Sequence, residues 1–408
     1  MPPIPTLPLE IVQEVVDILA QDGPDLSSIK ACSVTCKTYL PLCRKHIFSS
    51  ILLTGQIRPI HVSKPTLAAF IRVLSTTPEI AYYIRNLVYY PSMKDLDLPL
   101  LPETFMQIQN LESLSIHWPV RSQFQWNKNP LRLALLHLLH LPTLIRLEAR
   151  GIRDFVIVDL MPCTNLKEFK FSRINFAKTE NIFPSPLPSR PIRLRQLSAG
   201  EGSSAMVSKL YQTLRPDGKP ILDFTSIASV SLMVEEDDEL NASQEFLKRC
   251  RKLTHVQKFL DSSPLTWAGL SRVLHPSLQT LAHLHLKTMI TDPSGTNDPL
   301  SGLVTELQEM RHQNCIEKIT IQVSIQSGSD CNRGDDWGRL DEELARPGWL
   351  KLKSVLLSIT FCMRKNSDLE IALRKLPETQ FPRLSSSTSV LFDFSVINTA
   401  VLQGRFSS

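Results

Sequence analysis

Residues 281–286 read LAHLHL, and this spacing of apolar residues, apolar-x-x-apolar-x-apolar, recurs along most of the 408-residue chain. The alternating apolar positions at the end of each copy predict a short strand with one buried side. Strong and weak copies begin at the following other residues: Ile84, Leu111, Leu144, Leu166, Leu194, Ile227, Leu253, Ile316 and Leu352. Successive copies are 22 to 36 residues apart, a spacing typical of proteins built from repeated strand-and-return units.

This period predicts an α/β fold in which each copy adds a parallel strand and a return segment behind it. One copy cannot cover its own apolar side, so stacked copies must share a continuous core, and a curved solenoid with the parallel sheet on its concave side is expected. Helical periodicity predicts returns at residues 132–141, 206–214, 299–313 and 340–345. The alternative is an ordinary α/β domain of βαβ units. Against it, the chain has only 14 glycines and no glycine-rich phosphate turn.

Ahead of the repeats, residues 7–48 read LPLEIVQEVVDILAQDGPDLSSIKACSVTCKTYLPLCRKHIF. The pattern predicts an all-α module of three helices. The first begins at Leu9 and ends before residues 22–24, and Asp25 is expected to cap the second. The third is expected from about Cys36, with Pro41 either kinking or restarting it.

The first of these helices carries more apolar surface than one helix can hide. The apolar positions at helical spacing are Ile11, Val12, Val15, Val16, Ile18 and Leu19. Fewer than fifty residues cannot close a core around that surface, so we expect a docking module that packs on another chain or on the next segment. The alternative is a helical cap on the following domain.

Two motifs carry a family resemblance. Leu7-Pro8-x-Glu10-Ile11, followed by residues 29–39 with Val34-x-Cys36-Lys37-x-Tyr39, resembles an F-box, a family that binds the Skp adaptor of cullin-based ubiquitin ligases. Residues 336–352, DWGRLDEELARPGWLKL, resemble the motif that closes the irregular leucine-rich repeats of a large group of fungal F-box proteins.

The resemblance implies four segments: an F-box at 1–50, a linking strand and helix at 51–80, repeats at 81–360, and a C-terminal cap at 361–408 with a helix at 367–375 and a strand at 389–396. It also implies a non-catalytic subunit that binds a Skp-type adaptor and, through it, a cullin. The residues expected at the adaptor interface or in its supporting core are Leu7, Pro8, Ile11, Val15, Leu26, Ile29, Val34 and Tyr39.

A protein substrate is expected on the polar positions of the strands. Residues 146–195 hold ten Lys and Arg against five Asp and Glu, a difference equal to the +5 net charge of the chain. The expected substrate-binding residues are therefore Arg146, Arg150, Lys167, Lys170, His283 and His285. Such a surface suits an acidic or phosphorylated segment. Solvated strand faces are the alternative.

Composition excludes several other classes. A 42% hydrophobic and 21% charged chain is typical of a globular protein. No basic segment precedes an apolar run at the N-terminus and no apolar run reaches about 18 residues, so neither a signal peptide nor a membrane span is predicted. Eight scattered cysteines indicate reduced thiols and a cytoplasmic or nuclear protein. The basic segment lacks the aromatic residues of a nucleic-acid-binding surface, so no nucleic-acid partner is predicted.

The sequence motifs that could indicate metal binding or catalysis are weak. Cys32, Cys36, Cys43 and His46 could suggest zinc, but their helical spacing favours core packing, and the pair His283 and His285 lacks a third metal ligand of sensible spacing. Nucleophile-elbow, phosphate-loop and dinucleotide-binding patterns are missing. We therefore predict no cofactor, no metal and no catalysis. Two alternatives remain, a repeat scaffold outside any ligase and an undetected enzyme.

Overall fold

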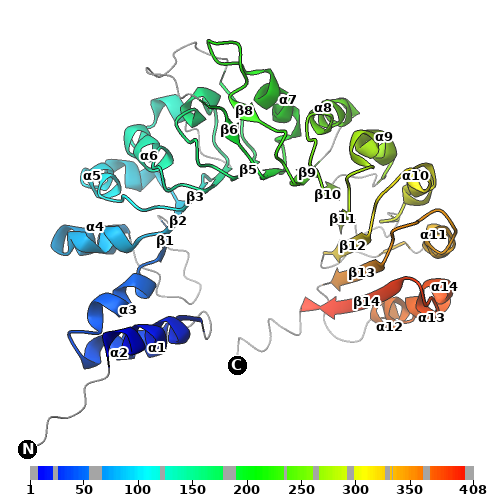
Figure 1. Ribbon diagram of the computed structural model, residues 1–408, viewed down its shortest axis with the longest axis horizontal. Coiled ribbons are helices and arrows are strands. Elements are labelled where there is room, and N and C mark those ends of the chain that lie inside the picture. Colours follow the sequence, from blue (N-terminus) through cyan, green and yellow to red (C-terminus); the bar gives the residue numbers. More distant parts are fainter. Residues whose placement is uncertain are drawn as a thin grey trace, which may run out of the picture. The chain divides into compact units, whose positions relative to one another are not determined.

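The computed structural model is a mixed α/β structure (Figure 1), and it describes residues 8–21, 26–54, 67–119, 125–177, 190–233, 237–260, 266–291, 298–326, 331–332, 334–361 and 368–399. The chain forms two compact units. The first comprises residues 1–169 and 173–192, and the second comprises residues 170–172 and 193–408.

The first unit begins with the three predicted helices, α1 (Leu9–Gln21), α2 (Ser27–Thr35) and α3 (Leu40–Ile47). The third helix starts later than predicted, because Pro41 lies in its first turn, where a missing N–H costs no hydrogen bond. Pro41 thus restarts the chain as a helix and does not kink it. The expected cap Asp25 lies outside the described residues.

The rest of the first unit alternates strands with helical returns. Its parallel strands follow one another in chain order from β1 to β5. The elements are β1 (Ser50–Thr54), α4 (Leu67–Thr76), η1 (Pro78–Tyr83), β2 (Asn86–Tyr90), η2 (Met93–Asp97), α5 (Leu101–Met106), β3 (Ser113–His117), η3 (Trp126–Lys128), α6 (Arg132–Leu139), β4 (Arg146–Arg150), η4 (Ile157–Leu160) and β5 (Glu168–Ser172). The last three residues of β5 belong to the second unit.

The second unit continues the alternation, with parallel strands in the order β7-β9-β10-β11-β12-β13-β14 and a separate pair of β6 and β8. Ile192, the first residue of β6, belongs to the first unit. Its elements are β6 (Ile192–Arg193), β7 (Gln196–Ala199), α7 (Ser204–Gln212), β8 (Leu222–Asp223), β9 (Ser229–Met233), α8 (Asp237–Leu247), β10 (His255–Leu260), α9 (Leu270–Leu274), η5 (His275–Ser277), β11 (His283–Ile290), α10 (Leu303–Met310), β12 (Lys318–Ile325), α11 (Asp336–Leu344), β13 (Ser354–Phe361), α12 (Asp368–Arg374), α13 (Leu376–Thr379), α14 (Pro382–Ser385) and β14 (Leu391–Asn398).

Every predicted copy of the apolar pattern leads into a strand, which begins two residues after the first apolar position of the copy. A repeated backbone contact fixes where each strand begins relative to its neighbour. The carbonyl of Arg85 accepts hydrogen bonds from the N–H groups of Glu112 and Ser113 at 2.7 and 2.9 Å. In the second unit the carbonyl of Ala282 accepts from Glu317 and Lys318 at 2.8 and 3.0 Å. The strand positions predicted from the sequence are therefore confirmed.

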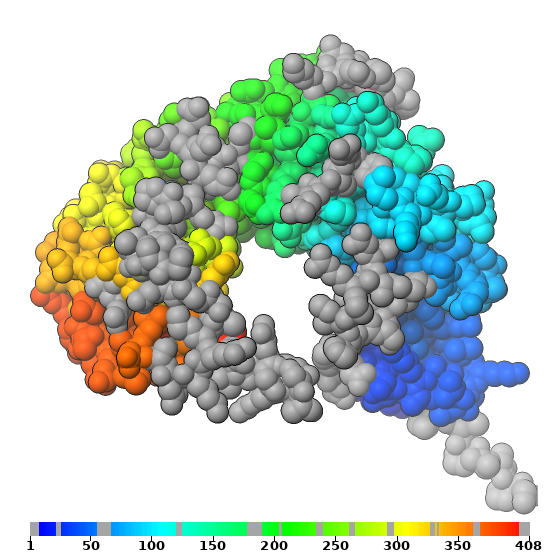
Figure 2. Space-filling model, turned by 180° about the vertical axis from the view of Figure 1, so that it is seen from behind, coloured from blue at the N-terminus to red at the C-terminus, as the bar shows by residue number. Residues whose placement is uncertain are grey.

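In each unit the helices lie on one side of the strands (Figure 1). Most strand side chains that face the helices are buried, and most of those on the opposite side, which we name the open strand face, are at least partly exposed. Within each unit, colours on the surface follow the order of the sequence, so each copy contacts the copies before and after it (Figure 2). This arrangement buries one apolar layer between strands and helices.

The predicted return helices are present as α6, α7, α10 and α11, with different bounds. Helix α10 starts only at Leu303 because Gly302, with φ of 75°, ends the preceding turn in the left-handed region. Helix α11 starts at Asp336, four residues before the predicted start. The predicted C-terminal helix and strand correspond to α12 and β14, and two short helices lie between them.

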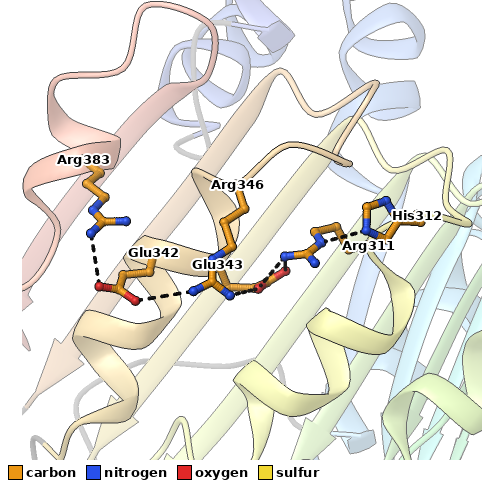
Figure 3. Close-up of polar contacts among 6 residues, drawn as sticks. All are labelled: Arg311, His312, Glu342, Glu343, Arg346 and Arg383. Atoms are coloured by element: carbon orange, nitrogen blue, oxygen red, sulfur yellow. Dashed lines mark hydrogen bonds and ion pairs between the residues drawn. The ribbon is translucent and has the colours of Figure 1, made fainter.

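An ion-pair network joins the helices near the end of the second unit (Figure 3). Arg311, just after α10, approaches both carboxylate oxygens of the buried Glu343 at 3.1 and 3.2 Å. Arg346 lies 3.5 Å from Glu343 and 3.8 Å from Glu342, and Arg383 of α14 lies 3.1 Å from Glu342. The closing motif therefore supplies the carboxylates of α11 that pair with Arg311, just after α10, and with Arg383 of α14.

Candidate functional site

Helix α1 has two apolar faces, one buried and one exposed. Val12 and Val16 are 8% and 1% exposed and pack in a small core with Ile29 and Cys43. Ile11, Val15 and Ile18 are 44%, 50% and 54% exposed. Their i, i+4, i+7 spacing puts them on one side of the helix. We name these three residues the α1 stripe. The module thus forms its own core and still leaves an apolar surface available for a partner.

The other residues predicted for adaptor binding fall in three places. Pro8 is exposed, and its carbonyl accepts hydrogen bonds from the backbone N–H groups of Ile11 and Val12. Val34 is 84% exposed. Ile29 is buried, and Leu26 and Tyr39 are half-buried supports of the same core. Leu7 lies outside the described residues.

Two apolar residues of α1 extend the set predicted for adaptor binding. Leu9 and Ile18 are both exposed. Ile18 could have been found from its spacing of seven residues after Ile11, which the sequence shows directly. Leu9 carries no such signal, because it lies on a different side of the helix.

Polar contacts fix α1 against α3 and α3 against the next return. His46 Nε2 lies 2.6 Å from Asp17 Oδ1, and Lys45 Nζ lies 3.5 Å from the same oxygen. The hydrogen bond with His46 is the main cause that lowers the pKa of Asp17. Arg44 pairs with Glu79 of η1 at 3.3 Å. The orientation of the α1 stripe is therefore tied, through α3, to η1 of the same unit.

Two of the three cysteines of the module act as small apolar residues. Cys43 is buried and Cys32 packs against the same core, whereas Cys36 is exposed. Burial, with a contribution from Cys32, raises the pKa of the Cys43 thiol to about 11. Within the described ranges, no three His, Cys, Asp or Glu side chains are grouped closely enough to hold a metal ion.

On the first unit, the open strand face mixes charges. Arg146 and Arg150 are exposed at the two ends of β4, with Glu148 between them. His117 lies 3.7 Å from Glu148 and stacks on Tyr90 with ring centroids 4.7 Å apart. Burial is the main cause that lowers the pKa of His117. This face offers both signs of charge and an aromatic pair.

The structure does not describe the predicted basic residues as one site. Arg146 and Arg150 share a strand and a face in the first unit. Lys167 precedes β5 and has the parity of its buried residues, Phe169 and Phe171, so alternation does not put it on the open strand face. Lys170 is exposed on β5 but belongs to the second unit.

The second unit collects histidines on its open strand face. His283 and His285 are on β11, as predicted, and His255 of β10 joins them with ring centroids 5.3 Å from His283. His283 Nε2 lies 3.1 Å from Thr320 Oγ1, and Lys318 is exposed beside it in the register. His255 was not predicted because its copy, which starts at Leu253, has a weak pattern.

These histidines share a face without counter-charges. Strands β9 to β13 contain no Asp or Glu. Burial, followed by the positive field of His255, Lys318 and His285, lowers the pKa of His283 to about 4. Burial and the neighbouring lysines also lower the pKa of His285. His283 and His285 are therefore uncharged near neutral pH, beside the lysines of this face.

One titratable group lies inside the apolar layer of the second unit. Lys258 of β10 is buried, with Nζ 5.9 Å from the ring centroid of Trp267. Burial lowers the pKa of Lys258 to about 8. The nearby cleft that includes Glu306 is lined by residues of α8, α9 and α10 and not by Lys258. The lysine thus lacks the access to this cleft that a reactive amine would need.

No protein-family model matches the chain, and no curated protein matches it. None of the helices in the described segments combines the length and the apolar composition needed to cross a membrane.

Proposed function

We propose that this chain is the substrate-recognition subunit of a Skp-cullin-F-box ubiquitin ligase. In this proposal α1 to α3 are the F-box, and the parallel strands with their returns are irregular leucine-rich repeats stacked in a curved solenoid. The chain supplies no catalytic residue. It holds a substrate near the ubiquitin carrier and so raises the effective concentration of the substrate.

The exposure of the α1 stripe carries this proposal. Ile11, Val15 and Ile18 are about half exposed although Val12 and Val16 already complete the core of the module. A contiguous exposed apolar surface on a helix is typical of a protein–protein interface. The F-box resemblance specifies the partner as a Skp-type adaptor.

Co-expression with a fungal Skp adaptor tests the proposal. Wild-type chain should co-purify with the adaptor in stoichiometric amount, and Ile11→Asp/Val15→Asp should abolish co-purification, because two charges would be buried without partners. Leu133→Asp is the matched control, since Leu133 is an exposed leucine on α6 of the same unit. Circular dichroism and thermal melting should show that all three proteins fold.

The co-purification result distinguishes a ligase subunit from a repeat scaffold. Absence of adaptor binding by a folded wild-type chain would overturn the ligase assignment and would leave a repeat scaffold outside any ligase. Equal loss of binding in Leu133→Asp would show that the effect is not specific to the α1 stripe.

The proposed substrate surface is the open strand face, with an acidic or phosphorylated segment as its ligand. The charged side chains available to such a ligand are Arg146 and Arg150 in the first unit and Lys318 in the second. His283 and His285 lie on the same face as Lys318 and add uncharged polar surface. Charge reversal of Arg146 and Arg150 should remove part of the proteins captured from a lysate, and Lys318→Glu should remove another part. Capture of an unchanged set of proteins by both variants would contradict this surface.

A further inference from the structure

Strand β14 forms the end of the strand order in the second unit and has only β13 as a described neighbour. Leu391 donates its N–H to the carbonyl of Lys353 at 2.8 Å, so the backbone groups of Leu391 point toward β13. Backbone direction alternates along a strand. The N–H and C=O groups of Phe392, Phe394 and Val396 therefore point away from β13, along the outer edge.

The outer edge carries exposed apolar side chains on both of its sides. Leu391 and Ile397, on the open strand face, are 71% and 43% exposed. On the helix side, Phe392, Phe394 and Val396 are partly exposed, whereas the equivalent residues of β13 are fully buried. Asp393 is the only charged residue of the strand. Natural edge strands are usually protected by lysine, proline or a bulge, and β14 is eight residues long and contains neither lysine nor proline.

We propose that the β14 edge pairs with β14 of a second copy of this chain, antiparallel and centred on Phe394. A two-fold axis at Phe394 brings the outward backbone groups of Phe392, Phe394 and Val396 opposite those of the second copy. It also places Leu391 opposite Ile397. This pairing is independent of the proposed ligase role.

Side-chain chemistry selects the register centred on Phe394. In that register Phe392 faces Val396, Phe394 faces itself, and Asp393 faces Ser395, so apolar residues meet apolar residues and no like charges meet. A centre at Asp393 would put two carboxylates directly opposite each other, which is destabilising. A centre at Ser395 would put Asp393 opposite the apolar Ile397.

Dimerisation would bring two copies of each binding surface into one particle. Two linked binding sites gain apparent affinity for a partner that offers two matching segments, without any new contact. The pairing buries only one strand edge from each copy, so the dimer should be weak and concentration-dependent.

Sedimentation velocity of the purified full chain, measured over a wide concentration range, tests the proposal. Wild-type protein should shift from monomer to dimer as concentration rises. Leu391→Lys/Ile397→Lys should remain monomeric, and Leu350→Lys should dimerise like wild type, because Leu350 is exposed in the same unit but outside the strand. A wild-type chain that stays monomeric, or a double variant that still dimerises, would overturn the proposal.

Cysteine cross-linking tests the register. In a Cys36→Ser background, a mixture of the Asp393→Cys and Ser395→Cys chains with oxidised glutathione should give a covalent heterodimer, whereas neither chain alone should cross-link. Cross-linking of either variant with itself would refute the Phe394 centre. Capture of an extended peptide by a strictly monomeric chain would show that the edge binds a different partner.

Discussion

The α1–α3 module and strands β11 to β13 are both amphipathic, but they differ in how many of their apolar residues are buried. In β11 to β13 the apolar side chains that face the helices are nearly all buried, between strands on both sides and helices behind. In the module, two apolar residues of α1 are buried and six are not, counting the half-buried Leu19 and Ala20 with the exposed Leu9 and the α1 stripe. A stacked repeat has neighbours that complete its core, whereas a three-helix module must find a partner.

A cavity in the repeat core should have the largest effect. Leu357→Ala should lower the free energy of unfolding by about 2–5 kcal/mol, because Ile321 and Phe394 flank the side chain and cannot close the gap. Ile29→Ala in the module should cost less, since the small cluster around Ile29 can collapse. Urea denaturation of both variants measures the two losses in the free energy of unfolding. Equal losses would show that the repeat core and the module core respond alike to a cavity.

Lys258 is a defect in the otherwise apolar layer of the repeats, so Lys258→Met should stabilise the protein. Because the pKa of Lys258 is about 8 in the folded state, against an ordinary value of 10.5, the unfolded state binds more protons between these pH values. Wild-type stability should therefore rise between about pH 8 and pH 10, and the full penalty should be present at pH 7. We expect a gain of about 2–3 kcal/mol for Lys258→Met at pH 7.

Urea denaturation at pH 7 and pH 9.5 checks both statements. The Met variant should lose the increase with pH that the wild type shows. Lys287→Met, on the open strand face, should have little effect and is the matched control. A wild type whose stability is flat across this range would show that Lys258 is neutral or paired in a different way.

The ion-pair network should contribute less than the apolar core. Glu343→Gln should cost about 1–3 kcal/mol, because the buried carboxylate pairs with both Arg311 and Arg346. Glu342→Gln should cost about 1 kcal/mol or less, since both of its arginine partners are exposed. The two thermal midpoints, measured under the same conditions, compare these variants directly. A larger loss for Glu342→Gln would contradict the role of burial.

The α1 stripe should matter least for stability. Ile18→Ser should change the free energy of unfolding by less than about 0.5 kcal/mol, because the side chain is about half exposed. The same variant should weaken adaptor binding, which isothermal titration with the purified adaptor measures. A large loss of stability would show that the stripe already packs within this chain.

The sequence predicted the repeated strands well because each strand depends on local alternation. The short helices α9 and α14 escaped prediction because distant side chains stabilise them. Glu306 accepts hydrogen bonds from the N–H groups of Gly269 and Ser271 at the start of α9. Asp341 accepts from Arg383 and Leu384 at the start of α14. Helices of four or five residues have too few internal hydrogen bonds to leave a periodic signal.

The candidate surfaces too were predictable where local periodicity decides them and unpredictable where distant contacts do. The apolar stripe of α1 could be read from the sequence, but the split between buried Val12 and Val16 and exposed Ile11 and Val15 could not. Likewise, His283 and His285 follow from strand alternation, whereas His255 joins them only through the pairing of β10 with β11.

The sequence alone therefore determined where the strands begin, which of their side chains alternate toward the core, and how much apolar surface the N-terminal module carries. Those properties depend on residues a few positions apart. Only the tertiary structure decided which α1 residues stay exposed, which histidines meet, and that β14 ends the strand order with an apolar edge. Those properties depend on contacts between residues far apart in the chain, and local periodicity contains no information about them.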